Sequence, residues 1–229
     1  MDTIMGGSKS IEFGADLIKK GEIVAFPTET VYGLGASAYN EDAVKKIFIA
    51  KGRPQDNPLI VHISSPIDAI EIAKEIPDEA YVLWEMFSPG PLTLVLNKKS
   101  IIPDIVTAGY QTVGIRIPNN EIALSLISKS GLPLAAPSAN LSGRVSPTEA
   151  IHVYKDLNGR IPLIIDGGRC NIGIESTVLD LTKNTPTILR PGFISPEQIA
   201  ERIGNVINHK GDIVRVESPG MKYSHYMTI

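Results

Sequence analysis

The sequence contains a single cysteine, Cys170, among its 229 residues. One cysteine cannot form an intrachain disulfide or a zinc site built from several cysteines. The four histidines, at positions 62, 152, 209 and 225, are too scattered to suggest a metal cage. No apolar run approaches the ~18 residues of a membrane span, and the first ten residues hold no apolar signal core. These absences predict a protein without membrane segments in a reducing cytoplasm.

Three common catalytic motifs are also missing. The sequence has no G-x-x-x-x-G-K-[ST] segment, which excludes a P-loop enzyme. Gly33 and Gly35 lack the third glycine of a dinucleotide fingerprint. No G-x-S-x-G elbow is present, so we interpret Ser138 and Ser176 as hydrogen-bonding groups rather than nucleophiles.

The charge balance limits the class of partner. The formal net charge is −3, and charged residues make up 21% of the chain against 43% apolar residues. This composition supports a buried core and argues against disorder. Because affinity for nucleic acid without sequence preference depends on cations, tight binding of that kind is not expected.

Apolar periodicity predicts helices that alternate with strands along most of the chain. Asn40 and Asn119 or Asn120 are expected to cap helices, and Pro66 to begin another. A first helix, capped by Ser8 or Ser10, is predicted to reach Lys20, and another is predicted to begin at Pro66. Further helices are predicted over 40–51, 77–87, 120–129, 147–157 and 196–203. Strands are predicted over 22–26, 59–63, 92–96, 112–117, 132–136, 162–165, 176–181 and 186–189, and residues 27–35 are interpreted as a loop. The pattern indicates an α/β protein with a central sheet covered by helices, and adjacent strands near the end favour a mixed sheet.

The loop at residues 51–62 is cationic and rigid, and it lies between a predicted helix and a predicted strand. Lys51 supplies a point charge and Arg53 a planar fork, which suits a polyphosphate. Pro54 and Pro58 restrict the backbone, so less entropy is lost on binding. The alternative is a solvated turn with two surface cations.

Other arginines lie in loops close to strand ends, where open α/β sheets bind ligands. They are Arg116, Arg144, Arg169 and Arg190. A protein that is acidic overall but carries cations in these loops is expected to bind a small anionic ligand there. Surface ion pairs are the alternative for each arginine taken singly.

Six short motifs follow one another in order along the chain. They are residues 27–35 (PTETVYGLG), Lys51-x-Arg53 with Asn57-Pro58-Leu59 and His62, residues 114–118 (GIRIP), residues 137–143 (PSANLSG), Ser176-Thr177, and Arg190-Pro191-Gly192. Together they resemble the YrdC-like family of threonylcarbamoyl-AMP synthases, and the likeness extends from about residue 11 to residue 226.

The resemblance implies a fold and a reaction. The fold is a twisted mixed sheet with flanking helices around a deep concave cleft. The reaction joins L-threonine, bicarbonate and ATP into threonylcarbamoyl-adenylate and releases pyrophosphate, with magnesium expected to act through the ATP phosphates rather than a side-chain cage. The product serves a downstream threonylcarbamoyl transferase machinery that modifies position 37 of tRNA. A weak contact with tRNA is a further expectation.

The resemblance also assigns roles to residues of this chain. The expected threonine contacts are Thr30, His62, Arg116 and Ser176. The expected ATP contacts are Arg53, Asn57, Thr112, Ser138, Ser146, Arg190 and Tyr226. Lys51, Arg53, Ser138 and Asn140 are the expected catalytic set, with Lys51 neutralising phosphate charge and Asn140 ordering the phosphates and magnesium. No protein nucleophile is required, which agrees with the missing motifs.

The expected domain division is a catalytic domain over residues 1–207 and a linker or tail over residues 208–229. Longer family members carry a second domain after a segment that resembles residues 218–226. The density of rings at Tyr223, His225 and Tyr226 predicts that the tail covers the active site, and a remnant of a lost domain is the alternative.

Two other functions remain open at this point. One is an RNA-binding YrdC-like module without its own catalysis, which the net charge disfavours. The other is a module of a larger carbamoyltransferase, whose zinc-finger and acylphosphatase-like parts have no counterpart in this sequence.

Overall fold

Short apolar segments form the strands of the computed structural model, which describes residues 2–208. Most of these strands are buried along their whole length, as expected where helices cover a sheet. The strands are β1 (Ile4–Gly6), β2 (Val24–Phe26), β3 (Gly33–Ser37), β4 (Ile60–His62), β5 (Leu92–Asn97), β6 (Thr112–Arg116), β7 (Leu134–Ala135), β8 (Leu163–Ile165), β9 (Thr177–Asp180), β10 (Thr187–Arg190) and β11 (Ile207–Asn208).

The longer helices begin and end at residues that terminate helices well. Asn40 accepts a hydrogen bond from the Ala43 amide, and Asn120 accepts from the amides of Ile122 and Ala123, which confirms both predicted caps. The helices are α1 (Ile11–Lys19), α2 (Glu41–Lys51), α3 (Ala69–Ile72), α4 (Asp78–Phe87), α5 (Asp104–Thr107), α6 (Glu121–Ser130), α7 (Ala150–Leu157) and α8 (Pro196–Ile203), with short 3-10 turns at Ser8–Ser10 and Pro66–Asp68.

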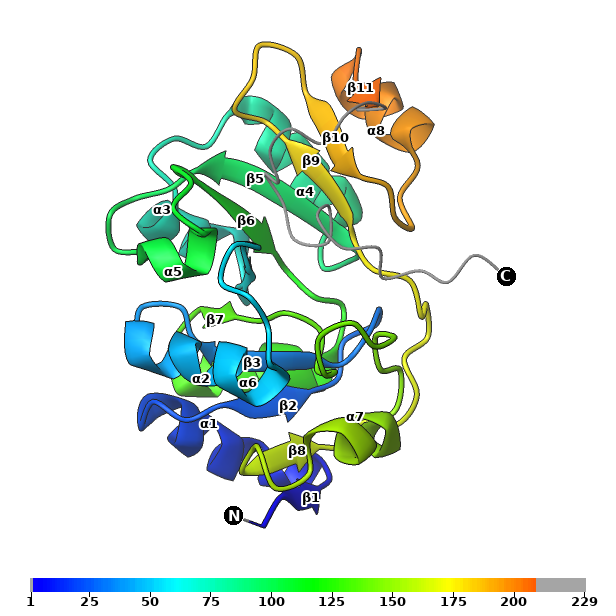
Figure 1. Ribbon diagram of the computed structural model, residues 1–229. Helices are drawn as coiled ribbons and strands as arrows, with labels where there is room; N and C mark the ends of the chain where they lie inside the picture. Colours follow the sequence, from blue (N-terminus) through cyan, green and yellow to red (C-terminus); the bar gives the residue numbers. More distant parts are fainter. Residues whose placement is uncertain (1, 209–229) are drawn as a thin grey trace.

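The described strands form one mixed sheet, as predicted. Its order is β1-β8-β2-β3-β7-β4-β6-β5-β9-β10-β11. Strand pairs β2–β8, β4–β6 and β5–β9 are parallel, whereas β2–β3, β5–β6 and β9–β10 are antiparallel. Strand direction changes along the sheet, since β2, β3 and β7 lie nearly horizontal in Figure 1 while β5 and β9 run obliquely above them.

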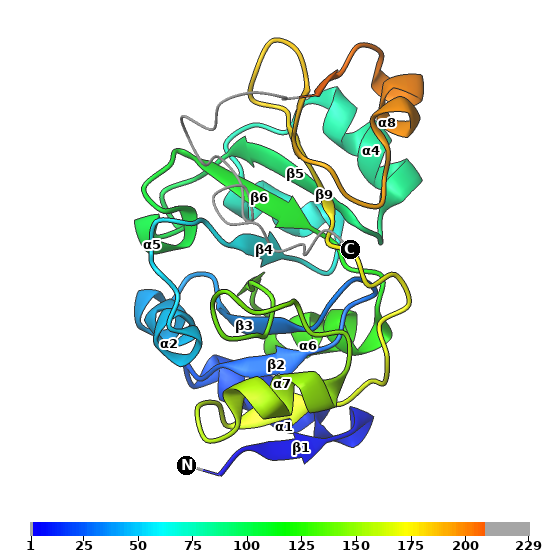
Figure 2. The ribbon, with the colours of Figure 1, turned by 45° about the vertical axis from the view of Figure 1, so that its right-hand side comes forward.

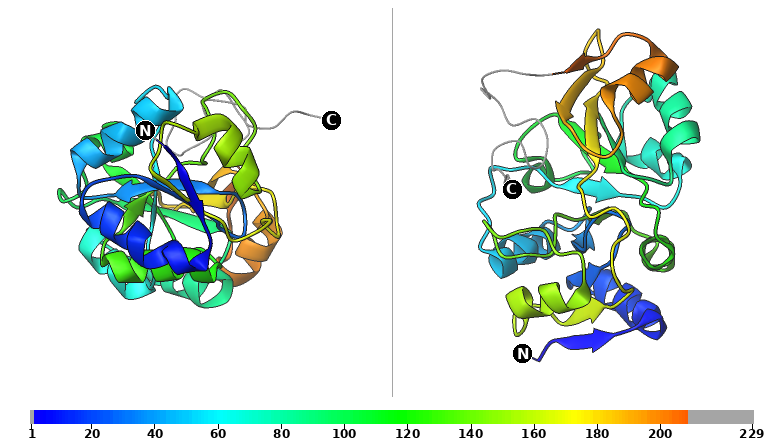
Figure 3. Two further views of the ribbon diagram at one scale, coloured as in Figure 1. Left: turned by 90° about the horizontal axis from the view of Figure 1, so that it is seen from below. Right: turned by 90° about the vertical axis from the view of Figure 1, so that its right-hand side faces the viewer.

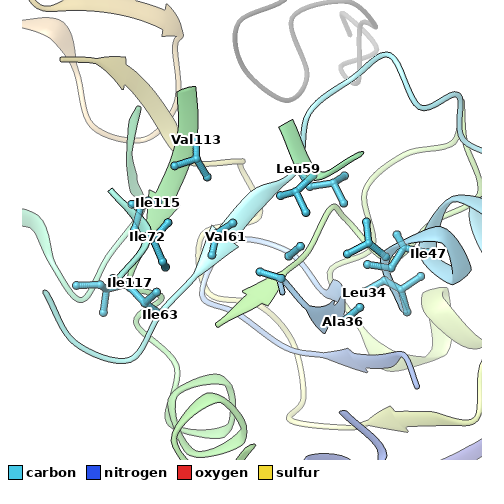
Figure 4. Close-up of a cluster of buried hydrophobic side chains, with 14 of the residues drawn as sticks. Leu34, Ala36, Ile47, Leu59, Val61, Ile63, Ile72, Val113, Ile115 and Ile117 are labelled. Atoms are coloured by element: carbon cyan, nitrogen blue, oxygen red, sulfur yellow. The ribbon is translucent and has the colours of Figure 1, made fainter. Parts of the chain in front are cut away.

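Two apolar clusters fix the helices against the sheet. The smaller cluster joins α1 and α6 to one face of β2, β7 and β8, with Phe26 and Leu126 fully buried in it. The larger cluster holds α2, α4, α7 and α8 against strands β2 to β10, including other residues of β2, β7 and β8, and continues across the middle of the molecule. Figure 4 shows this continuity, because Leu34 and Ile47 of the lower half lie near Leu59, just before β4, and Val61 of β4. The core therefore ties both halves of the sheet together.

The molecule is elongated along the sheet. β1, β8, β2, β3 and β7 lie in the lower half, and β4, β6, β5, β9 and β10 lie above them (Figures 1 and 2). The side view in Figure 3 shows the chain crossing between the halves several times. The site described below lies where these halves meet.

The structure departs from the sequence-based prediction at three places. Residues 33–37 form strand β3, although 27–35 were predicted as a loop. Helix α7 begins at Ala150 rather than Pro147, because the carbonyls of Pro147 and Thr148 accept hydrogen bonds from Tyr32 and Cys170. Segments β1, α5 and β11 were not predicted.

None of the helices within residues 2–208 has the length and apolar character needed to cross a bilayer.

Candidate active site

One cavity collects polar side chains from segments far apart in the chain. His62 and Arg116 are direct partners across the parallel pair β4–β6, at the carboxyl ends of both strands. The turn after β2 and the loop after β7 border the same space. The lining residues are Thr28, Thr30, Val31, Gly33, Arg53, Ile60, His62, Arg116, Ala136, Pro137, Ser138, Glu175, Ser176 and Arg190. Seven of them were predicted from the sequence: Thr30, Arg53, His62, Arg116, Ser138, Ser176 and Arg190.

Arg116 is a buried cation with fixed orientation. It is only 4% exposed. Its Nε donates to the carbonyl of Gly90 (3.3 Å), and its Nη2 donates to Thr30 Oγ1 (2.9 Å) and lies 2.8 Å from Glu29 Oε1. No partner within residues 2–208 engages Nη1. A guanidinium held on two of its nitrogens is prepared to bind a carboxylate with the third.

The loop between β2 and β3 is organised by the hydroxyl of Thr28. Thr28 Oγ1 donates to the carbonyl of Val31 (2.6 Å) and accepts from the amides of Thr30 (3.1 Å) and Val31 (3.2 Å). This turn places the Thr30 hydroxyl against the Arg116 guanidinium. The polar residues of the PTET segment therefore build the turn and the cavity wall together.

A second buried ion pair borders the cavity. Arg190 Nη1 lies 2.6 Å from Glu175 Oε2, and its Nη2 donates to the carbonyl and the hydroxyl of Ser176. Ser146 donates to the other Glu175 oxygen at 3.0 Å. Ser176 also shares a hydrogen bond with Thr93 at 2.8 Å. Arg190 thus fixes Ser176 toward the cavity.

Lys51 and Asn140 lie behind the cavity wall. Lys51 is 2% exposed, contrary to the expectation of an exposed cationic loop. Its Nζ donates to the carbonyls of Ser138 and Asn140, and the Asn140 amide donates to the carbonyls of Leu141 and Arg144. Burial, with the nearby Arg53, lowers the pKa of Lys51 well below its usual value. The geometry gives these two side chains a role in shaping the loop that carries Ser138, and it offers no support for direct phosphate contact.

Asn57 is fully buried, yet its side-chain amide is unsatisfied. Neither Oδ1 nor Nδ2 has a hydrogen-bond partner among the described residues. Its carbonyl accepts from Arg53 Nη2 at 3.3 Å, which places it beside an arginine of the cavity. An unsatisfied buried amide costs about 1–3 kcal/mol, so such a group is expected to meet a polar ligand. Asn57 does not line the cavity itself, so its predicted ATP contact stays a prediction.

His62 is held in its neutral form. Burial, and then the charge of Arg116, lower its pKa to about 3. The edge of its ring meets Phe26 at a centroid distance of 6.1 Å, and its Nδ1 has no partner among the described residues. A neutral imidazole beside a guanidinium can offer a hydrogen bond to a ligand without adding charge.

Three predicted residues lie elsewhere. Thr112 is at the opposite end of β6 from Arg116, paired with Asn97, and it does not line the cavity. Ser146 reaches the cavity only through Glu175. Tyr226 lies outside the described residues, as does the rest of the predicted tail beyond Asn208.

The sequence analysis missed both acidic residues of the site. Glu29 and Glu175 are 5% and 9% exposed, and each forms an ion pair with a cavity arginine. Both lie inside or beside the quoted motifs, Glu29 between Thr28 and Thr30 and Glu175 directly before Ser176. The sequence could have indicated them, because a buried arginine requires a counter-charge and these glutamates lie in or next to the motifs that contain cavity residues.

No cluster of three or more metal-ligating side chains (His, Cys, Asp or Glu) occurs within residues 2–208. The carboxylates of Glu29 and Glu175 are engaged by Arg116 and Arg190. Magnesium held through the phosphates of ATP would need no side-chain cage, and it stays a prediction.

A family model covering Sua5, YciO and YrdC, described as "Telomere recombination", matches residues 16–192. The chain belongs to the Sua5/YciO/YrdC family. The match contains all the lining residues of the cavity.

Relatives within this family are close in sequence. The chain is 54% identical over 220 residues to a threonylcarbamoyl-AMP synthase of Pyrococcus abyssi, covering 94% of this chain and 65% of the relative. It is 52% identical over 229 residues to the Bacillus subtilis threonylcarbamoyl-AMP synthase, covering 98% and 66%. The chain thus spans slightly less than two thirds of the length of these Sua5/YciO/YrdC relatives.

A solved structure of the family has the same fold. The crystal structure of P. abyssi Sua5 complexed with L-threonine superposes with a TM-score of 0.94 at 51% identity, over 98% of this chain and 69% of the Sua5 chain. This agreement confirms the expected Sua5/YciO/YrdC architecture of a mixed sheet with flanking helices.

Proposed function

We propose that the protein makes threonylcarbamoyl-adenylate from L-threonine, bicarbonate and ATP, releasing pyrophosphate. The single observation that carries this proposal is the cavity itself. A guanidinium with one open nitrogen, a neutral imidazole and two further arginines converge there. The names of the close relatives, and the threonine bound to P. abyssi Sua5, support the choice of substrate.

The arrangement suits a reaction between bound substrates. The threonine carboxylate binds Arg116 Nη1, with Thr30, His62 and Ser176 around the amino acid. Its ammonium loses a proton, and the free amine attacks the carbon of bicarbonate. A C–N bond forms, a C–O bond breaks and water leaves, which gives the carbamate. A carbamate oxygen then attacks the α-phosphorus of ATP, the α–β bridge bond breaks, and pyrophosphate leaves.

Arg53 and Arg190 are proposed to face the phosphates, with Asn57 and the Ser138 hydroxyl as hydrogen-bonding groups. Cations placed where phosphate charge moves during bond cleavage lower the barrier. Magnesium, when bound to the ATP phosphates, would neutralise charge on the leaving pyrophosphate. Thr112 and Ser146 would act less directly, from the far end of β6 and through Glu175.

The experiment is to incubate the protein with ATP, magnesium and bicarbonate, with and without L-threonine. Pyrophosphate release that depends on both threonine and bicarbonate supports the proposal. Release at the same rate without threonine, or none under any condition, contradicts it. Omitting magnesium tests the metal requirement in the same assay.

Further parts of the proposal concern partners and location. The product would pass to a threonylcarbamoyl transferase machinery that acts on position 37 of tRNA, in the cytoplasm. A salt titration of tRNA binding separates this role from that of an RNA-binding module, because binding through phosphate contacts weakens steeply with salt. The proposed cover formed by residues 208–229 is tested by truncation after Asn208, which should weaken ATP binding and raise AMP release per pyrophosphate.

A further inference from the structure

Glu29 is the most isolated charged group of the site. Its side chain is 5% exposed, and its Oε1 lies 2.8 Å from Arg116 Nη2. The contact lacks the direction of a hydrogen bond, and no described residue donates to either carboxylate oxygen. A carboxylate this buried normally accepts several hydrogen bonds. Among the described residues, the one positive charge in contact with Glu29 is the guanidinium of Arg116, which is also expected to bind the carboxylate of the ligand.

The backbone holds Glu29 in place. Its carbonyl accepts from the Ile172 amide at 2.9 Å, and the next carbonyl, of Thr30, accepts from the Gly173 amide at 3.1 Å. The residues on either side of it, Thr28 and Thr30, belong to the turn that the Thr28 hydroxyl organises. Glu29 does not line the cavity, so it acts on a ligand through Arg116 and through its field.

The hydrogen bonds of the turn hold the Thr30 hydroxyl beside Arg116. Thr28 has one hydroxyl proton and donates it to the carbonyl of Val31. Its two lone pairs accept from the amides of Thr30 and Val31, so the 2.9 Å contact between the two hydroxyls does not decide where the Thr30 proton points. Thr30 Oγ1 accepts from Arg116 Nη2, which leaves one further lone pair that can accept from a ligand. The cavity thus presents a hydrogen-bond acceptor, Thr30 Oγ1, beside Arg116 Nη1. The carboxylate of Glu29 lies against the same guanidinium.

The charges next to Arg116 form two balanced ion pairs, and the cavity carries a third arginine, Arg53, besides them. Arg116 and Glu29 cancel, as do Arg190 and Glu175, and His62 carries no charge at neutral pH because its pKa is about 3. A simple anion that binds at Arg116 gains little net attraction from these pairs yet loses its hydration. A zwitterion places its carboxylate on Nη1 and its ammonium against Thr30 Oγ1 and the field of Glu29.

We propose that Glu29 is a positioning and specificity residue that tunes Arg116 to accept α-amino acids and reject carboxylates without an amino group. The inference rests on the proposed function, because it concerns how that function's amino-acid substrate is chosen. In the empty site Glu29 neutralises the buried guanidinium, and in the bound site its charge is matched by the ligand's ammonium. Without the charge of Glu29, the site at Arg116 is expected to bind carboxylates whether or not they carry an amino group.

The test measures the dissociation constants of two ligands of nearly the same shape by calorimetry, in the absence of ATP. They are L-threonine and 2,3-dihydroxybutanoate of the same configuration, in which a hydroxyl replaces the amine. The native protein should bind threonine about ten-fold or more tightly than the hydroxy acid. In Glu29→Gln the hydroxy acid should bind more tightly than before, and the preference should shrink to about two-fold or less. Glu29→Asp, which keeps the charge, should retain most of the preference.

The control is Asp104→Asn, which removes the carboxylate partner of another buried cation, Lys98, outside the cavity. It should lose stability and leave the ligand preference unchanged. Equal weakening of both ligands in Glu29→Gln, or an unchanged preference, overturns the inference while leaving the proposed function intact. A native protein that binds both ligands equally also overturns it, whether or not any variant folds. A native protein that binds no threonine overturns the proposed function as well.

Discussion

The ammonium of Lys51 donates to the main-chain carbonyls of Ser138 and Asn140, both at 2.5 Å, and so joins the end of α2 to the loop after β7. Two of the six motifs, Lys51-x-Arg53 and residues 137–143, thus form one structural unit. Lys51 acts inside this unit, whereas Arg53, two residues further on, lines the cavity. The Lys51-x-Arg53 motif therefore contains one residue that supports the loop structure and one that lines the cavity.

The first prediction separates these roles by mutation. Lys51→Met should lower the free energy of unfolding by several kcal/mol, because two buried carbonyls lose their donor at about 1–3 kcal/mol each. Arg53→Gln should change stability far less and should reduce pyrophosphate release about ten- to a hundred-fold. Urea denaturation and the pyrophosphate assay measure both variants. Equal stability of Lys51→Met and the native protein would contradict the structural role of Lys51.

The second prediction concerns acid stability through His62. Its folded-state pKa of about 3 lies below the unfolded value of 6.5. The unfolded chain therefore binds the extra proton first, so the stabilising contribution is complete above pH 6.5 and is lost as the pH falls toward 3. The slope is about 1.4 kcal/mol per pH unit within that window. Urea midpoints between pH 7 and pH 4 should fall more steeply for the native protein than for His62→Gln. His152→Gln, on the exposed side of α7, is the control and should follow the native slope.

The third prediction explains the glycine of the Arg-Pro-Gly motif. A Cβ on Gly192 would lie 2.4 Å from the Thr177 nitrogen and 2.6 Å from the Glu175 carbonyl oxygen. Since both neighbours are backbone, Gly192→Ala must displace the segment that carries Ser176. The expected loss is about 1–3 kcal/mol of stability, with weaker threonine binding. Gly7→Ala, where a Cβ meets nothing within 4 Å, should be neutral. A fully stable and active Gly192→Ala protein would show that the close approach is not required.

Much of the fold followed from local signals in the sequence. The caps at Asn40 and Asn120 and the apolar strands were predicted because each depends on neighbouring residues. Strand β3 was missed because its glycines resemble a loop. In the structure a Cβ on Gly35 would lie 2.7 Å from the Phe26 ring, so glycine is required there by packing across the β2–β3 pair. That requirement is set by tertiary contacts.

The sequence predicted which arginines belong to the candidate site. It did not predict which side chains are buried or how they pair. The quoted motifs supplied Arg53, Arg116 and Arg190, all of which line the cavity. They could not show that Lys51 points into the loop interior or that Glu29 and Glu175 neutralise two of the arginines. Burial and pairing depend on which segments meet in space, and the spacing of residues in one motif carries little of that information.

The last prediction concerns the choice among natural amino acids. The remaining lone pair of Thr30 Oγ1 is assigned to the ligand ammonium, so the neutral imidazole of His62 is the polar group left for a ligand hydroxyl. Serine keeps the hydroxyl and lacks a methyl, which should cost about 1–3 kcal/mol. Valine lacks the hydroxyl and leaves a buried polar group without a partner, so it should be rejected more strongly than serine. The measurement is kcat/KM for threonine, serine and valine in the pyrophosphate assay. If valine performs as well as serine, the ligand hydroxyl is not recognised by His62.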